Sequence, residues 1–216
     1  MISALVPVGA RLVDCVTALT DTSAAELRRA GVDGAIRYLG SVTVAEMGAI
    51  TVAGLGVMVV TYADRFDGSS ALAELSAIGY PAGATVWLDV ECLGAKLETS
   101  TIVGEINAWA RVVASAGYVA GLYVGANALL TSAELTALLV TRYWRGMSRL
   151  VDRAGTLAEP APGYCVSQLY PTTTIVGVSV DVDFAGQDWQ GRSASWAVSA
   201  RRSFTCSPLT AHLPVA

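Results

Sequence analysis

The sequence predicts an α/β fold, a single (β/α)8 barrel of the TIM type that is irregular in its last third and ends in a C-terminal tail. Short runs rich in β-branched and aromatic residues alternate with segments of helical periodicity, which is the pattern of βαβ units. There are eight such runs, the number that closes this kind of barrel. In addition, 53% of the residues are hydrophobic and only 15% are charged, as expected when parallel strands are buried on both faces.

The eight candidate strands are short apolar segments, most of which end near a polar or aromatic residue. They span residues 12–15, 35–39, 56–62, 85–90, 119–124, 143–145, 164–169 and 179–184. The connections after the sixth and seventh strands look irregular, and the pattern stops after residue 186. We therefore assign residues 1–186 to the barrel and residues 187–216 to a tail or interaction arm.

Helices are expected between these strands. A Ser or Thr followed three residues later by Glu, the capping-box pattern, occurs at 23–26, 43–46 and 131–134 and predicts three helix starts. Segment 101–116 carries apolar residues at helical spacing, which predicts one buried stripe against the sheet. The members of this stripe are Ile102, Ile106, Trp109 and Val113.

Several functional classes find no support in the sequence. The net charge of −4 and the pI near 4.9 give no basic surface for nucleic acid, and no glycine-rich phosphate-binding motif follows a strand. Residues 47–63 lack formal charge but contain Gly54 and Gly56, which predicts a helix end, a turn and a buried strand and not a membrane span. No signal peptide is evident at the N-terminus.

The four cysteines are widely spaced and form no CxxC pair, which argues against a zinc ribbon or a thioredoxin-type site. We expect buried free thiols, with a disulfide left open. The single histidine, His212, lies in the expected tail. Nucleophilic triads and zinc hydrolases need imidazole groups, so hydrolytic chemistry in this chain has to use carboxylates, without a metal or cofactor.

Carboxylates gather at the ends of three predicted strands. Asp89 and Glu91 stand at i and i+2 where an apolar strand ends, Asp14 closes the first strand, and Asp181 and Asp183 lie in the eighth. Side chains at i and i+2 of a strand share a face, and the carboxyl ends of barrel strands form the active-site mouth. Crowded carboxylates raise one another's pKa, which suits Glu91 for the role of a general acid.

Other interpretations of these acids stay open. An acid at a strand end can cap the next helix or pair with Arg37, Arg65 or Lys96, and an all-oxygen cluster can bind Mg²⁺ or Ca²⁺. Two acids in an otherwise apolar strand are costly unless they are solvated or used, which favours a functional role for Asp89 and Glu91.

Polar and aromatic residues at strand ends are candidates for substrate binding, because sugar rings stack on aromatic faces, although aromatic residues in a barrel often belong to its core. The aromatic candidates are Tyr38, Tyr62, Tyr123 and Trp144, and Gln168 and Asp183 offer groups for sugar hydroxyls.

The order of these residues resembles that of the family-25 glycoside hydrolases, the muramidases of phages and bacteria. The resemblance covers about residues 10–186 and consists of single landmarks along the chain, each of them a short motif. They are Asp14, Tyr62, the DxE of Asp89 and Glu91, Tyr123 in GLY, Trp144, Gln168, and Asp181 and Asp183 in VDVD. The phrase AAELRRAGVDGAIRYLG is similar to a related glycoside-hydrolase-like domain of unknown function, found in phage lysins and secreted actinobacterial proteins.

The resemblance implies a barrel that cleaves the β-1,4 bond after N-acetylmuramic acid in peptidoglycan. In that assignment Glu91 is the proton donor, Asp89 stabilises the oxocarbenium-like state or orients the acetamido group, and Asp14 and Asp181 shape the site. Two departures stand out. The Tyr-His-Phe often found at strand three is replaced by Tyr62-Ala63-Asp64, and the strand-eight aspartate of the family matches either Asp181 or Asp183.

Two classes of function therefore remain. The first is a lysozyme-like muramidase, phage-encoded and acting on the bacterial wall from the host periplasm, the outside or the virion. The alternative is a non-catalytic glycan-binding barrel that serves as a virion or tail component, with virion or oligomer contacts through residues 187–216. The partner in both cases is peptidoglycan or another cell-wall glycan.

Overall fold

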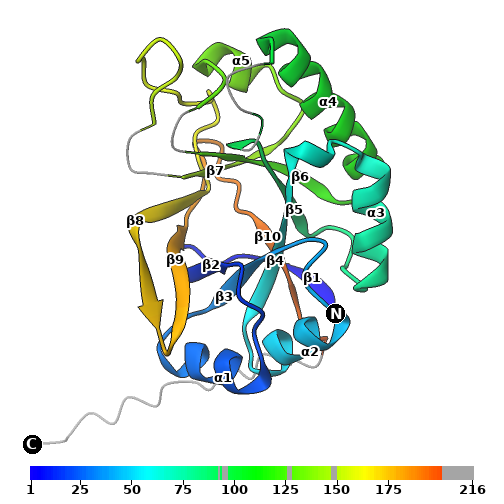
Figure 1. Ribbon diagram of the computed structural model, residues 1–216, viewed down its shortest axis with the longest axis vertical. Coiled ribbons are helices and arrows are strands. Elements are labelled where there is room, and N and C mark those ends of the chain that lie inside the picture. The colour runs from blue at the N-terminus through cyan, green and yellow to red at the C-terminus, as the bar shows by residue number, and fades with distance from the viewer. Residues whose placement is uncertain (92, 94–96, 126–127, 147–149, 201–216) are drawn as a thin grey trace, which may run out of the picture.

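The computed structural model describes residues 1–91, 93, 97–125, 128–146 and 150–200, and within these residues the chain forms a closed barrel with helices outside it (Figure 1). The ring follows the order β4-β3-β2-β9-β8-β7-β6-β5 and closes where β5 pairs with β4. Its strands are β2 (Arg11–Cys15), β3 (Gly34–Tyr38), β4 (Gly56–Tyr62), β5 (Thr85–Asp89), β6 (Val119–Val124), β7 (Arg142–Arg145), β8 (Val166–Ile175) and β9 (Val178–Ala185). Each overlaps one of the predicted strands, so the predicted barrel is confirmed.

The last third departs from a regular (β/α)8 barrel. Strands β2 to β8 run parallel, whereas β9 is antiparallel to both of its neighbours, β8 and β2. The β8–β9 connection is a tight turn in which Val176 (φ 47°) and Gly177 (φ 79°) both adopt positive φ, as a two-residue hairpin loop requires. The irregularity expected in this region is therefore a β-hairpin in place of a final helical crossover.

Helices surround the barrel on its outer face (Figure 1). They are α1 (Asp21–Arg29), α2 (Val44–Val52), α3 (Gly68–Ala77), α4 (Thr99–Ser115) and the short α5 (Ser132–Thr136), with a 3-10 turn η1 at Ala63–Arg65. The predicted stripe of α4, from Ile102 to Val113, is fully buried. Outward-facing strand residues and the helices share one apolar cluster, while a second cluster fills the barrel interior, so the strands are buried on both faces.

One of the three predicted helix starts needs correction, and one of the three capping boxes is incomplete. Helix α1 begins one turn earlier than the 23–26 pattern indicates, because Thr20 is its N-cap and forms the capping box with Ser23. Thr43 caps α2 as expected, but the Glu46 side chain pairs with Arg37 and does not bond back to Thr43, so only one of the two capping-box bonds is present. The box of α5, between Thr131 and Glu134, is confirmed.

The uncharged stretch 47–63 divides as predicted into the end of α2, a turn with Gly54 at φ 84°, and β4. No helix in the described part of the chain is long and apolar enough to cross a membrane. Cys15 and Cys165 are buried free thiols, as expected. Cys92 and Cys206 lie outside the described residues.

The sheet continues beyond residue 186, which corrects the tail boundary. Strand β10 (Ser195–Val198) pairs with β4 and with an N-terminal strand, β1 (Ile2–Leu5), that the sequence pattern did not indicate. All four residues of β10 are buried, so there is no alternation of polar and apolar residues to reveal the strand. Only residues 201–216 of the expected tail, including His212, lie outside the described residues.

Trp196 explains how β10 is held. Its indole lies against Gly34 and Gly56, where neighbouring β3 and β4 begin, so that a Cβ at Gly34 would come within 2.7 Å of the ring. The residue is 6% exposed and belongs to the cluster that fills the barrel interior. Trp196 therefore packs across the end of the barrel opposite the carboxyl ends of the parallel strands.

Candidate active site

The candidate site lies at the carboxyl ends of the parallel strands. These ends meet at one end of the barrel because the strands all run in the same direction. Every predicted site residue belongs to a strand of the ring, except Glu91, which lies two residues after the end of β5. Asp14 and Asp181 are direct partners across β2 and β9, and Asp89 lies between Tyr62 on β4 and Tyr123 on β6 in the sheet register. The fold thus brings acids that are far apart in sequence to one mouth.

Asp89 is the last residue of β5 and is only 3% exposed. Its Oδ1 accepts a hydrogen bond from the backbone N–H of Glu91 at 2.9 Å. The strand therefore ends before Glu91, and the two acids do not continue the i, i+2 alternation that the sequence predicts. Asp89 instead fixes the turn that carries Glu91.

The exposed Glu91 side chain lies above Gly125, the residue that follows β6. A Cβ at Gly125 would overlap the Glu91 carboxyl group. A glycine is thus required here for the position of the acid. The requirement follows from close approach and not from a special backbone conformation, so nothing in the sequence pattern signals it.

Asp14, 5% exposed, is held by a chain of side-chain hydrogen bonds. The Tyr123 hydroxyl donates to Gln168 Oε1 at 2.9 Å, and Gln168 Nε2 donates to Asp14 Oδ2 at 2.9 Å and to Asp181 Oδ2 at 3.3 Å. One amide thereby bridges the two acids that face each other across β2 and β9.

Asp183 and Trp144 lie beneath this layer. Trp144 Nε1 donates to Asp183 Oδ1 at 2.7 Å, and the two residues are 2% and 0% exposed. The Trp144 ring also packs against Tyr123, with ring centroids 4.4 Å apart. The sequence pattern predicts substrate contacts for Tyr123, Trp144 and Asp183, yet all three are buried, so in this structure they support the site from below.

Burial dominates the electrostatics of the mouth. It raises the pKa of Asp14 to about 7, with repulsion from Asp181 as a smaller cause and the Gln168 hydrogen bond opposing it. Burial also raises the pKa of Asp89 to about 6, against the effect of the Glu91 N–H, and raises that of Asp183 well above its usual range. Crowding of like charges therefore acts as predicted, but desolvation is the larger cause.

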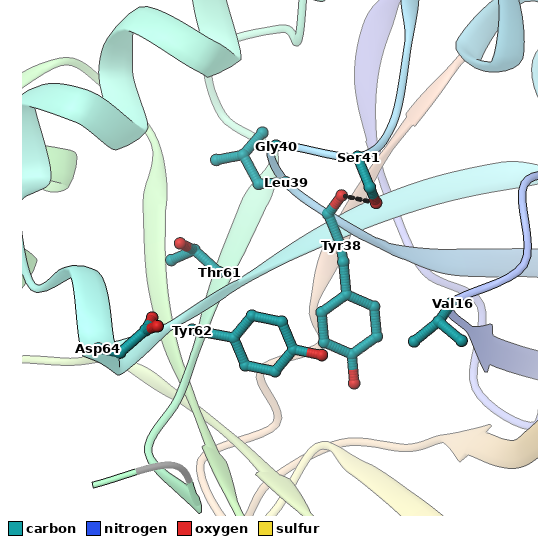
Figure 2. A pocket seen from close by; sticks show the side chains of 8 residues that line it. All are labelled: Val16, Tyr38, Leu39, Gly40, Ser41, Thr61, Tyr62 and Asp64. Carbon is teal, nitrogen blue, oxygen red and sulfur yellow. Dashed lines mark hydrogen bonds between the residues drawn. The ribbon is translucent and has the colours of Figure 1, made fainter.

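An open pocket of about 330 Å³ lies at the ends of β3 and β4, and one of its lining residues, Tyr62, is the neighbour of Asp89 in the sheet register. Tyr38 and Tyr62, at the ends of β3 and β4, stack with their ring centroids 4.7 Å apart and an interplanar angle of 22°. In Figure 2 Asp64 flanks this pair on one side and Val16 on the other. Half-buried tyrosine rings in an open pocket are the surface that a sugar ring can stack on.

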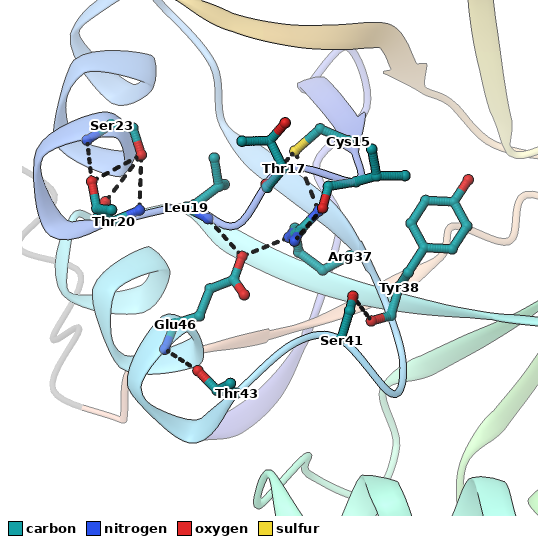
Figure 3. Close-up of polar contacts among 11 residues, drawn as sticks. Cys15, Thr17, Leu19, Thr20, Ser23, Arg37, Tyr38, Ser41, Thr43 and Glu46 are labelled. Carbon is teal, nitrogen blue, oxygen red and sulfur yellow. Dashed lines mark hydrogen bonds and ion pairs between the residues drawn. The ribbon is translucent and has the colours of Figure 1, made fainter.

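Arg37 does not pair with the mouth acids. Its Nε donates to Glu46 Oε1 at 2.7 Å in a buried ion pair, and its NH2 donates to the Val16 carbonyl oxygen at 3.4 Å (Figure 3). Glu46 Oε1 also accepts from the Leu19 N–H at 2.8 Å. The ion pair thus holds the β2–α1 loop, which supplies Val16 to the pocket. Lys96 and the Arg65 side chain, the other predicted partners, lie outside what the structure describes.

Among the described residues, no group of three or more His, Cys, Asp or Glu side chains is arranged to hold a metal ion. The structure brings Asp14, Asp89, Glu91 and Asp181 together at the mouth, with Gln168 joined to two of them. Sequence reasoning missed Gly125 and the role of Glu46 in holding the β2–α1 loop. The capping-box pattern predicts that the Glu46 side chain bonds to the backbone of Thr43. The Glu46 backbone N–H does bond to Thr43, but the carboxylate pairs with Arg37 instead.

Comparison with known proteins agrees with this architecture. Residues 25–185 match the family model described as Rv2525c-like, glycoside hydrolase-like domain, which bears out the resemblance to a glycoside-hydrolase-like domain. No curated protein matches the sequence.

Three solved structures share the fold at low sequence identity. An uncharacterized protein of B. stearothermophilus has a TM-score of 0.64 and 18% identity, over 82% of this chain and 96% of that one. GHIP, a glycosyl hydrolase 25 of Streptococcus pneumoniae described as a virulence factor, has a TM-score of 0.57 and 16% identity, over 82% and 86%. A bacterial lysozyme from Streptomyces coelicolor has a TM-score of 0.56 and 14% identity, over 84% and 94%.

Proposed function

The chain belongs to the Rv2525c-like, glycoside hydrolase-like family, and from that premise we propose that it is a lysozyme-like hydrolase of bacterial cell-wall glycan. One observation carries the proposal. The buried Asp89 carboxyl lies at the mouth with the Glu91 backbone bonded to it, beside an open pocket walled by stacked tyrosines. A pair of carboxyl groups beside a sugar-binding surface is what glycoside hydrolysis uses.

In the proposed reaction Glu91 donates its proton to the oxygen of the β-1,4 glycosidic bond as the bond to the anomeric carbon breaks. Asp89, ionised above a pH of about 6, stabilises the positive charge that develops at that carbon or orients the acetamido group. A water molecule then adds to the anomeric carbon and returns a proton to Glu91. Asp14 and Asp181 hold the far side of the mouth through Gln168.

Mass spectrometry of a purified peptidoglycan digest tests the proposal, because it shows whether bonds break and whether the new end is muramic acid or glucosamine. We expect Glu91→Gln to lower the rate by more than about 100-fold, the scale of a lost general acid. Glu98→Gln is the matched control, since Glu98 is exposed just beyond the same loop, and it should leave the rate unchanged.

Absence of product from the wild-type protein would refute the hydrolase. The binding-only alternative uses the same Tyr38 and Tyr62 surface, so a pull-down on insoluble wall material separates the two functions. Equal retention of the wild-type protein and Glu91→Gln, without product, would select a glycan-binding barrel.

For the setting, we propose a phage-encoded lysin that reaches the wall from the host periplasm, from outside or on the virion. Its support is the resemblance to the domain of phage lysins, carried by the phrase AAELRRAGVDGAIRYLG at residues 24–40. Light scattering of the isolated chain tests the assembly role, since a monomer with a protease-sensitive C-terminus would contradict contacts made through the tail.

A further inference from the structure

Asp183 is a buried acid that the proposed reaction does not use. It has no exposed surface, and its Oδ1 accepts the Trp144 indole N–H at 2.7 Å. Among the described residues no donor reaches its other oxygen, Oδ2. A buried carboxylate oxygen without a donor is costly, so the protonation state of this group needs a physical explanation.

The neighbour of Asp183 is Asp14. The two side chains share a face of the β2–β9 pair, with Asp14 opposite Asp181 and Asp183 two residues along β9, and diagonal neighbours of this kind are within reach of each other. The two carboxyl groups are close enough to shift each other's pKa, and a proton on either one gives the pair a donor for the other. Two ionised carboxylates have only acceptors, which is why Oδ2 lacks a partner in that state.

The charged groups that act most strongly on this pair, among the residues that the structure describes, are acidic. Asp14 faces Asp181 on β9 and Asp89 on β5, and Asp183 faces Asp14 and Asp181. Among the described groups that act on Asp14 and Asp183 there is no Lys or Arg side chain to offset two negative charges. The remaining polar partners, Gln168 and Trp144, each donate one hydrogen bond to one member of the pair.

We propose that Asp183 is a neutral carboxylic acid that donates a hydrogen bond from Oδ2 to Asp14, and that it is thereby a positioning residue beneath the mouth. The Asp14 carboxylate then has donors on two sides, Gln168 Nε2 and the Asp183 hydroxyl. The pair carries at most one negative charge, and Oδ2 gains the partner that it otherwise lacks.

The pKa directions agree with this assignment of the proton. Complete burial raises the pKa of Asp183 well above its usual range, and the contact with Asp14 raises it further. The same contact acts in the opposite direction on Asp14, because a donated hydrogen bond favours the ionised form. Asp183 is thus the member that keeps the proton, and Asp14 is the member that titrates.

Carbon-13 NMR of the full chain, labelled at the aspartate carboxyl carbon, tests the proposal without any substrate. Asp183→Asn identifies one signal by its loss, and Asp181→Asn, two residues away on β9, identifies a control. We expect the Asp183 signal to keep the position of a protonated acid at neutral pH, where an ordinary aspartate is ionised. A carboxylate signal for Asp183 at neutral pH would overturn the proposal, as would proof that the proton resides on Asp14.

Two substitutions separate positioning from simple support of the fold. In Asp183→Asn the amide still donates to Asp14, so the Asp14 midpoint should stay near that of the wild-type protein, about 7. In Asp183→Leu the donor is lost, and the midpoint should rise by about one unit, the scale of one hydrogen bond to a charged group. Equal midpoints in the two variants would refute the positioning role. If Asp183→Leu does not fold, the Asp183 signal of the wild-type protein alone decides.

The consequence for catalysis rests on the proposed function, whereas the NMR result does not. If the protein hydrolyses glycan, the pH profile of kcat/KM should be retained in Asp183→Asn, with its acid limb unmoved. A protein that does not cut glycan would still show a protonated Asp183. Failure of the hydrolase and failure of this inference are therefore distinguishable.

Discussion

Trp196 offers the most direct test of how the barrel is closed, because the side chain lies in a segment whose sequence predicts a tail. It is 6% exposed and covers Gly34 and Gly56. A buried Trp removes about 200 Å² from water, which at about 25 cal/mol per Å² corresponds to about 5 kcal/mol. Truncation of a buried Trp to Ala typically costs about 3–5 kcal/mol, so we expect Trp196→Ala to lower the unfolding free energy by about 4 kcal/mol.

Urea unfolding followed by circular dichroism measures this loss. At about 2–4 °C per kcal/mol for a domain of this size, the melting temperature should fall by about 8–16 °C. Trp189→Ala is the matched control in the same segment, because Trp189 is 76% exposed, and it should cost under about 1 kcal/mol. Equal losses for the two variants would refute the packing argument.

A double-mutant cycle sharpens the same test. Gly56→Ala alone places a Cβ inside the Trp196 ring and should destabilise the fold strongly. In a Trp196→Ala background the same Cβ enters vacated space, so its cost should shrink by about 1–3 kcal/mol, the range for residues in contact. Independent, additive effects would show that the two residues do not meet.

Three further predictions concern the mouth and its support. Activity should fall about tenfold per pH unit below a pH of about 6, measured as kcat/KM on soluble glycan, because the raised pKa of Asp89 means that its ionised form is lost there; an unchanged rate at pH 4 would contradict it. Gly125→Ala should lower kcat by at least about tenfold with little change in melting temperature, since the new Cβ displaces Glu91. Glu46→Ala should cost about 3–5 kcal/mol in urea unfolding because it leaves the fully buried Arg37 charge unpaired, whereas replacing both residues by apolar ones should cost far less.

Much of the barrel could be predicted from the sequence because its strands are continuous apolar runs. The segment 56–62 became β4 within the same bounds, since seven consecutive residues without a break signal one buried strand. Strand β10 could not be found in this way. It is four residues long, buried throughout, and held by contacts with β1 and β4 that are distant in sequence, so only tertiary packing defines it.

The candidate site, like the fold, could be predicted from the sequence only in part. The gathering of acids at one mouth follows from strand direction alone, so the sequence was enough to place Asp14, Asp89 and Asp181 there. Which of them is buried depends on where each strand stops. Because β5 ends at Asp89, Glu91 leaves the strand and becomes exposed, a one-residue boundary that periodicity does not resolve.

The depth of each carboxyl below the rim decides what it can do. Asp183 lies at the base with no exposed surface, Asp14 and Asp89 are nearly buried above it, and Glu91 is exposed at the rim. Burial is the largest cause of the raised pKa of the three buried acids, so the mouth carries fewer charges at neutral pH than its composition indicates. A glycan that bears carboxylates of its own therefore meets less repulsion than five ionised acids would exert. The apolar interior that closes the barrel thus also sets which acids at its mouth are ionised.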